Sequence, residues 1–236
     1  GNVSDNVVET EGPMQIIYQP TNTVDRLLIA SGDNDSKRSN VNANINYRYA
    51  VTGGTELNID ADYGKFSIRS NQFQPNDYYN AGGNIKLYSN VYRMISPTDI
   101  DIVSVKADYE RNFYKGKLGI GAKIGYVKTD NDFKRYDVIS GNDVYDKDKS
   151  NRFKYTENIN AGYVNYNRAF KGFMLQVGVR VENTISDGRS TGLQYDNTTS
   201  TYKNFDSSIH RNYVDVFPSA ALTFNKNPMS QFGLTF

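Results

Sequence analysis

Residues with reactive side chains are few in this sequence and lie far apart. The chain has no cysteine and one histidine, His210, which argues against a thiol metal site and against a histidine-based ligand set. Ser207 and Ser208 precede His210, and a hydrolytic serine needs a base within hydrogen-bond reach and a third group that orients the base. His210 lies in a polar stretch beside Arg211, so we interpret it as a surface histidine. A membrane-bound hydrolase is the weakest of three alternatives, and no catalytic residue is assigned.

Two acidic clusters resemble fragments of calcium-binding loops. They are Asp33-Asn34-Asp35 and Asp130-Asn131-Asp132. A calcium ion takes six to eight oxygen ligands, and neither cluster has a glutamate downstream at the EF-hand spacing. Aspartate and asparagine are also common turn residues, which explains both clusters better. The sequence therefore predicts no metal and no cofactor.

Tyrosine is the residue type that offers the best ligand contacts. The chain has 19 Tyr and 12 Phe but no Trp. Tyr78, Tyr79, Tyr195 and Tyr202 lie in two polar segments, 71–83 and 186–206, that we expect to be loops. A tyrosine ring gives rigid stacking area for a sugar or a peptide. The alternative is that these rings only pack loop against loop.

The composition limits the class of protein that the chain can be. Its 236 residues suffice for one large β domain, and the net charge of +1 gives no electrostatic footprint for a nucleic acid. The mean hydropathy is −0.65, and no apolar run reaches the roughly 18 residues of a transmembrane helix. A strand of a membrane barrel needs only about 9–11 residues, of which half are apolar.

The segment 101–126 shows the alternation that must position the polar residues. Val103, Val105, Ala107 and Tyr109 alternate with polar residues, and the pattern resumes with Leu118, Ile120, Ala122, Ile124 and Tyr126. Because successive side chains of a strand point to opposite faces, this is a hairpin with one apolar face. A turn at Lys115-Gly116 predicts a register that places Tyr109 opposite Ala122 and Asp108 opposite Lys123.

The same alternation recurs along the chain. Asparagine stands at every second position from Asn40 to Asn46, although it is a poor strand former, so this face must stay polar. Similar patterns occupy 57–63, 159–163, 175–181, 220–224 and 232–236. Four charged residues fall on the polar faces and are candidates for a lumen wall: Asp108, Lys123, Arg180 and Glu182. The alternative is that they are ordinary cross-strand charges that hold the register.

The predicted connections alternate between short and long. Turns at 52–54, 115–116, 170–172 and 226–228 are short, whereas 71–99, 130–151 and 186–211 are long and polar. The segment 130–151 is either a loop or a strand pair that projects beyond the apolar band. Short turns at one end and long loops at the other are typical of an outer-membrane barrel. The fold class is therefore all-β, an antiparallel up-and-down meander of about 8–10 strands that forms such a barrel or part of one.

Several stretches resemble the barrel of TonB-dependent outer-membrane receptors, in particular the outer-membrane β-barrel family that is abundant in Bacteroidetes. They are SPTDIDIVSVKADYERNF, KLGIGAKIGYVKTDNDF, RFKYTENINAGYVNYNR, VGVRVENT and NYVDVFPSAALTFNK, and the resemblance covers roughly 38–236. Residues 1–37 are only weakly patterned, so we expect 1–236 to be a single β-barrel domain fragment.

The resemblance implies a localisation and partners. TonB-dependent receptors have barrels of about 22 strands with a plug in the lumen, and they import iron chelates, glycans, peptides or vitamins with energy from a TonB system. It thus implies the outer membrane of a Gram-negative bacterium, lipid around the barrel, an unidentified solute, and a plug and TonB system that this sequence does not include. The opening GNVSDN has no signal peptide, and we expect a piece of a longer protein, although Phe236 also resembles a natural barrel C-terminus. The main alternative is a soluble β-barrel that binds a small ligand in an apolar interior.

Overall fold

The computed structural model describes residues 1–227 and 230–236, and these form nine antiparallel strands. The strands pair in chain order as an up-and-down meander, as the sequence predicted. Their bounds are β1 Asn2–Tyr18, β2 Thr23–Val51, β3 Thr55–Asn80, β4 Lys86–Phe113, β5 Gly116–Ile139, β6 Asn142–Phe170, β7 Phe173–Asp196, β8 Thr201–Asn227 and β9 Ser230–Thr235. No helix among the described residues is long and apolar enough to cross a membrane.

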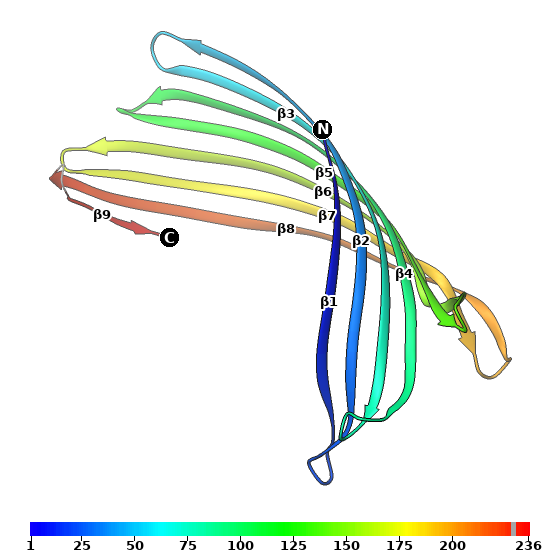
Figure 1. Ribbon diagram of the computed structural model, residues 1–236. Helices are drawn as coiled ribbons and strands as arrows, with labels where there is room; N and C mark the ends of the chain where they lie inside the picture. The colour runs from blue at the N-terminus through cyan, green and yellow to red at the C-terminus, as the bar shows by residue number, and fades with distance from the viewer. Residues whose placement is uncertain (228–229) are drawn as a thin grey trace.

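The strands make one curved and twisted sheet with no second layer on it (Figure 1). The turns that follow β2, β4 and β6 gather at the left of the view, and those that follow β1, β3, β5 and β7 lie at the bottom and lower right. Among the described residues, β1 pairs only with β2 and β9 only with β8, so the sheet is open.

Cross-strand pairing defines two faces of the sheet. Face A carries Ile45, Ala61, Val105 and Ile124, which pair in one row. Face B carries the residues between them on each strand. The apolar part of face A begins at the turns after β2, β4 and β6 and ends at the row of Tyr63, Val103 and Tyr126. We call this part of face A the apolar band.

No described residue packs against the apolar band. Ile45 is 74% exposed, and Ile124 is 57% exposed. Ala161 is the only hydrophobic residue among those described that is buried. A soluble protein of this size buries a contiguous core, so the band needs an apolar environment outside the described residues. This geometry does not match the alternative of a soluble barrel with an apolar interior.

Aromatic rings line the end of the band nearest the short turns. Phe170 stacks on Phe173 with ring centroids 4.6 Å apart, and the row continues through Phe224 and Phe232 at 6.3 Å per step. All four lie on face A. A row of aromatic rings at the edge of an apolar band is the arrangement of an interfacial girdle.

The predicted register of the central hairpin is wrong by two residues. The turn is Tyr114-Lys115, with positive φ values of 45° and 61°, so Phe113 pairs with Gly116. Asp108 therefore lies opposite Gly121, and Lys106 is the residue opposite Lys123. A shift of two keeps every side chain on its predicted face, and the period-two pattern cannot detect it. The ladder charge pair Asp108–Lys123 does not exist.

The predicted long loops are wrong as well, since strands continue through them. Of 71–99 only 81–85 lies outside a strand, and 186–211 is interrupted only at 197–200. The segment 130–151 is a strand pair with its turn at Ser140-Gly141, which confirms one of the two interpretations. The segment 31–39, whose Asp33-Asn34-Asp35 cluster was interpreted as turn residues, lies inside β2, and the weakly patterned residues 1–37 form β1 and the first half of β2. Of the predicted short turns, 52–54 and 170–172 are confirmed, whereas 226–228 extends outside the described residues.

Strand β6 reverses the usual distribution of its side chains. Ile159, Ala161 and Tyr163 pair with Gly125, Lys123 and Gly121, so these apolar residues lie on face B. Asn158 and Asn160 lie on face A beside Tyr126 and Ile124. The apolar band is therefore narrower at β6, where it is carried by Gly162, Val164 and Tyr166.

Candidate functional site

The polar residues of face B form a connected wall behind the apolar band. At one end, Asn46 and Asn44 donate hydrogen bonds to Asp60 and Asp62 across β2 and β3, at 2.5 and 2.6 Å. Ser104 of β4 donates to the second oxygen of Asp62 at 3.1 Å. Asn44 and Asn46, two of the four alternating asparagines, are thus donors to carboxylates on the next strand. This explains why poor strand formers occupy that face.

The centre of this wall is a cluster around Asp108. Lys106 Nζ lies 2.6 Å from Asp108 Oδ2, and the Tyr163 hydroxyl donates to Asp108 Oδ1 at 2.5 Å. Tyr163 comes from β6, so its ring crosses β5 to reach β4. It crosses over Gly121, where a β-carbon would overlap the ring. A side chain at that position would therefore break the link between β6 and β4.

The guanidinium of Arg180 extends the cluster towards β7. It pairs with Glu182 on its own strand and lies over the Tyr163 ring, 5.3 Å from the centroid. One hollow of about 460 Å³ is lined by Lys106, Asp108 and Arg180, and a second of about 400 Å³ by Lys123, Arg180 and Glu182. The structure thus brings the four predicted residues Asp108, Lys123, Arg180 and Glu182 to one surface, with Arg180 shared by both hollows.

Lys123 differs from the other three predicted residues. It lies opposite Lys106, and like charges directly opposite are destabilising. Lys106 is neutralised by Asp108, whereas Lys123 has no ion pair among the described residues. Its ammonium group is the free cation of this part of the wall.

The predicted tyrosine contacts lie on strands, at the ends farthest from the apolar band. Tyr78 stacks on Tyr88 at 4.4 Å between centroids, and Tyr79 pairs with Lys86. Tyr195 and Tyr202 meet edge to face at 5.2 Å. Three of the four predicted rings are therefore already in contact with another tyrosine, which favours packing between strands over a free platform.

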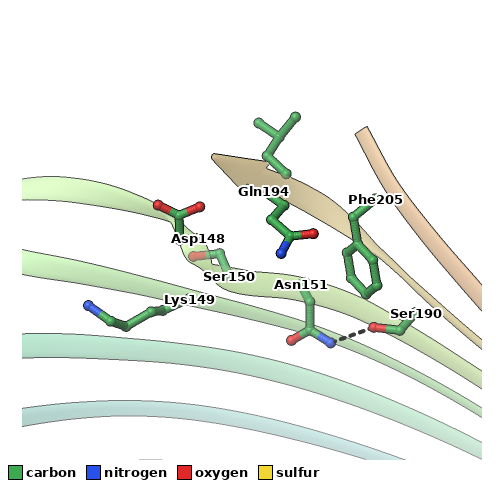
Figure 2. Close-up of a pocket in the computed structure, with 8 residues that line it drawn as sticks. Asp148, Lys149, Ser150, Asn151, Ser190, Gln194 and Phe205 are labelled. Atoms are coloured by element: carbon green, nitrogen blue, oxygen red, sulfur yellow. Dashed lines mark hydrogen bonds between the residues drawn. The ribbon is translucent and has the colours of Figure 1, made fainter. Parts of the chain in front are cut away.

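A hollow of about 370 Å³ is lined by Asp148, Ser190 and Phe205, among other residues (Figure 2), and the hydrogen bonds of Asp148 place it beside the second tyrosine pair. Asn151 donates to Ser190 Oγ at 2.9 Å on one side of it, and Phe205 presents its ring on another. Asp148 accepts hydrogen bonds from the Tyr195 backbone at 2.7 Å and from the Tyr202 hydroxyl at 3.4 Å. Amide, hydroxyl and carboxylate groups beside one apolar ring suit a polar solute.

Neither a hydrolytic site nor a metal site is assembled around the residues that could have formed one. His210 is largely exposed, and its Nδ1 lies 2.7 Å from Asp187 Oδ1. No serine among the described residues hydrogen-bonds to its ring. The hydrolase alternative required a buried histidine beside a serine. In the described part of the chain, no group of three or more potential ligands (His, Cys, Asp, Glu) is close enough to hold a metal.

Sequence reasoning missed Tyr163 and Lys106 as members of the wall. Tyr163 belongs to an apolar alternation that, taken strand by strand, is assigned to face A. The available signal was Gly121 beside it, since a glycine inside a strand often marks a close approach of another group.

Comparison with known proteins identifies the family. Residues 50–236 match the outer membrane protein beta-barrel family, and the chain belongs to it. No curated protein matches the chain. Among solved structures, the ferric yersiniabactin uptake receptor FyuA from Yersinia pestis aligns with 94% of this chain and 39% of its own at 12% identity (TM-score 0.44). The siderophore receptor PiuA from Acinetobacter baumannii aligns with 95% and 43% at 10% identity (TM-score 0.38).

The family and the apolar band agree on where the protein resides. It is an outer-membrane β-barrel protein of Gram-negative bacteria. The chain spans about two fifths of the length of each of these two receptors.

Proposed function

We propose that this chain forms part of the barrel wall of a TonB-dependent receptor that imports a solute through the outer membrane. Face A meets lipid, and face B lines the lumen. The observation that carries the proposal is the contrast between an exposed apolar band on face A and a hydrogen-bonded, charged wall behind it on face B. A wide, polar lumen that holds a plug requires such a wall.

In this proposal the chain has a passive role and catalyses no step. The wall around Asp108 and Arg180 offers hydrogen-bonding groups to a plug or to a passing solute, and Lys123 offers a free cation. In the proposal, the hollow beside Asp148 and Phe205, which lies at the strand ends farthest from the apolar band, is where a solute first meets the receptor. The names of the two solved receptors refer to ferric yersiniabactin uptake and to a siderophore, and the proposal assigns no solute to this protein.

Site-specific crosslinking in the complete protein tests the lumen assignment. Benzoylphenylalanine is placed at Lys123 on face B, or at its neighbour Ile124 on face A as the matched control. After irradiation of intact outer membranes, we expect an intramolecular crosslink from position 123 to a segment outside the barrel, and crosslinks to lipid from position 124. Mass spectrometry identifies both products.

Two results would oppose the proposal at different levels. Lipid adducts from position 123 would show that face B is not the lumen. If small water-soluble reagents label face B but position 123 yields no protein crosslink, the assignment of the chain to a barrel wall would stand. The plug, and with it the TonB-dependent mechanism, would be contradicted.

A further inference from the structure

A collar of charged residues lies on face A directly beyond the apolar band. In the row after Tyr126, Lys128 lies opposite Asp101 of β4 and Thr156 of β6. In the next row, Asp130 lies opposite Lys154, and Lys154 lies opposite Arg189. These positions continue the face that carries the band, so they lie where a lipid-facing surface passes from acyl chains to headgroups.

Two arginines of the collar are held rigidly by carboxylates. Arg152 donates two hydrogen bonds to Asp130, at 2.8 and 2.7 Å. Arg189 donates in the same bidentate manner to Asp206. Each fork fixes its guanidinium and neutralises its charge. The partner of Asp187 is His210.

Lys154 and Lys128 are the cations of the collar named above that no bidentate pair holds. The Lys154 Nζ atom lies 4.0 Å from Asp130 Oδ2, a carboxylate that already accepts both hydrogen bonds of Arg152, and the Lys154 side chain is 56% exposed. Lys154 also lies opposite Arg189, whose charge is already paired with that of Asp206. Lys128 has no ion pair within 4.0 Å among the described residues, including with the opposing Asp101.

The direction of the strands places this collar at the outer leaflet. The band begins at the turns after β2, β4 and β6, and the strands extend far beyond the band only at the other end. In outer-membrane barrels the periplasmic connections are short and the extracellular segments extend beyond the membrane, and here the strand halves beyond the band are those extracellular segments. The collar therefore meets the outer leaflet, which in Gram-negative bacteria is built from a phosphorylated glycolipid.

We propose that Lys128 and Lys154, with Arg152 and Arg189 beside them, bind a headgroup phosphate of the outer-leaflet glycolipid. The phosphate lies between Lys128 and Lys154, which are diagonal neighbours on β5 and β6, while the acyl chains of the same lipid cover the apolar band. The inference rests on the outer-membrane location and does not depend on solute uptake. Basic clusters next to an apolar membrane surface recognise anionic headgroups in this way.

The test is native mass spectrometry of the complete protein in mild detergent with added lipid A. The variant is Lys128→Gln with Lys154→Gln, and the matched control is Lys115→Gln with Lys171→Gln, two exposed lysines at the short turns. A lysine near an anionic surface contributes roughly a fivefold gain in affinity, so we expect the first pair to weaken binding about 25-fold. We expect the control pair to leave it unchanged. Each glutamine removes the charge and keeps most of the side-chain length, and the heat-dependent shift in gel mobility verifies folding.

Two further arms identify the lipid phosphate as the ligand. Dephosphorylated lipid A should bind the unmodified protein as weakly as phosphorylated lipid A binds the double variant. Millimolar inorganic phosphate should leave the lipid bound. The proposal would be overturned if the two double variants bound lipid A equally well, if dephosphorylation of lipid A did not change its binding, or if inorganic phosphate displaced the lipid.

Discussion

The two halves of each long strand have the same backbone structure but are stabilised by different means. Within the apolar band, face A carries exposed aliphatic and aromatic residues, and face B carries hydrogen-bonded charges. Beyond the band both faces carry polar and charged residues, and bidentate pairs such as Arg152–Asp130 and Arg69–Asp99 join neighbouring strands. A strand needs one apolar face only where one side of it meets lipid.

The comparison explains how one meander serves two solvents. In lipid, every backbone group must be paired within the sheet, and the side chains on the lipid face must be apolar. In water the second requirement disappears. The outer halves can therefore use residues such as Ser, Asp, Asn and Gly, which are typical of turns, while still pairing continuously.

The largest effect is expected from a charge placed in the apolar band. Ile45 is a face-A residue inside the band on β2 and is 74% exposed. Ile45→Arg should destabilise the protein by about 2–4 kcal/mol, because the guanidinium would enter the hydrocarbon core of the bilayer. Urea unfolding of the complete protein in lipid vesicles measures the change in the free energy of unfolding.

The matched control for that variant lies on the other face of the same strand. Asn42→Arg places the same side chain on face B and should cost less than about 1 kcal/mol. Equal losses for the two variants would show that both faces of the strand meet the same solvent. That result would contradict the division between lipid and lumen.

The second effect concerns the link across β5. Gly121→Ala should displace the Tyr163 ring and break its hydrogen bond to Asp108, at a cost of about 1–3 kcal/mol. Gly162→Ala is the control, because a β-carbon there meets nothing within 4 Å. It should be neutral or stabilising by up to about 1 kcal/mol. Urea unfolding in lipid vesicles compares the two variants.

A double variant sharpens this second prediction. If the cost of Gly121→Ala arises from the tyrosine, then combining it with Tyr163→Ala should remove most of the additional loss. Independent, additive losses would show that Gly121 matters for another reason.

The third effect lies in the outer half, where Asp148 joins two hairpins. Asp148→Ala removes the acceptor for the Tyr195 backbone and the Tyr202 hydroxyl. Local opening at Tyr195 should become easier by about 1 kcal/mol, since both bonds are exposed. Hydrogen exchange should accelerate there and leave the band unaffected. Asn197→Ala, in the turn of the same hairpin, is the control, and similar acceleration in that variant would contradict a specific role for Asp148.

Much of the fold follows from the sequence, because the alternation of apolar and polar residues identifies both the strands and the face on which each side chain lies. It predicted the meander and the strand count, and it grouped Asp108, Lys123, Arg180 and Glu182 on polar faces. The register of the central hairpin was not predictable in the same way. The predicted turn was Lys115-Gly116, because a glycine adopts a positive φ easily, but Tyr114 and Lys115 are the residues with positive φ values. The resulting shift of two residues leaves the face pattern unchanged.

The outer halves escaped prediction for a related reason. The segment 31–39 contains turn residues and no alternation, because both of its faces are polar, yet it pairs with β1 and β3. Sequence patterns report the contrast between two environments, so a strand with water on both sides has no pattern to show. Tyr163 was assigned to the wrong face because β6 does have an alternating pattern, but its apolar side lies on the polar face B of the sheet.

The smallest effect is a pH dependence of the outer half. The hydrogen bonds from Arg152, together with the nearby positive charges, hold the pKa of Asp130 below its ordinary value. A carboxyl group whose pKa is lower in the folded state stabilises that state above its unfolded pKa of about 3.9, and this contribution is lost as the pH falls through the folded pKa. Amide exchange in the hairpin of β5 and β6 should therefore accelerate at acid pH beyond its intrinsic pH dependence.

The variant Asp130→Asn should remove part of this acceleration, because an asparagine side chain does not titrate. Exchange within the apolar band should stay the same in both proteins. An unchanged acid response in the variant would assign the effect to other carboxylates of the outer half, such as Asp99 and Asp206, whose pKa values are also lowered, Asp99 by Ser67 and Arg69 and Asp206 by Arg189.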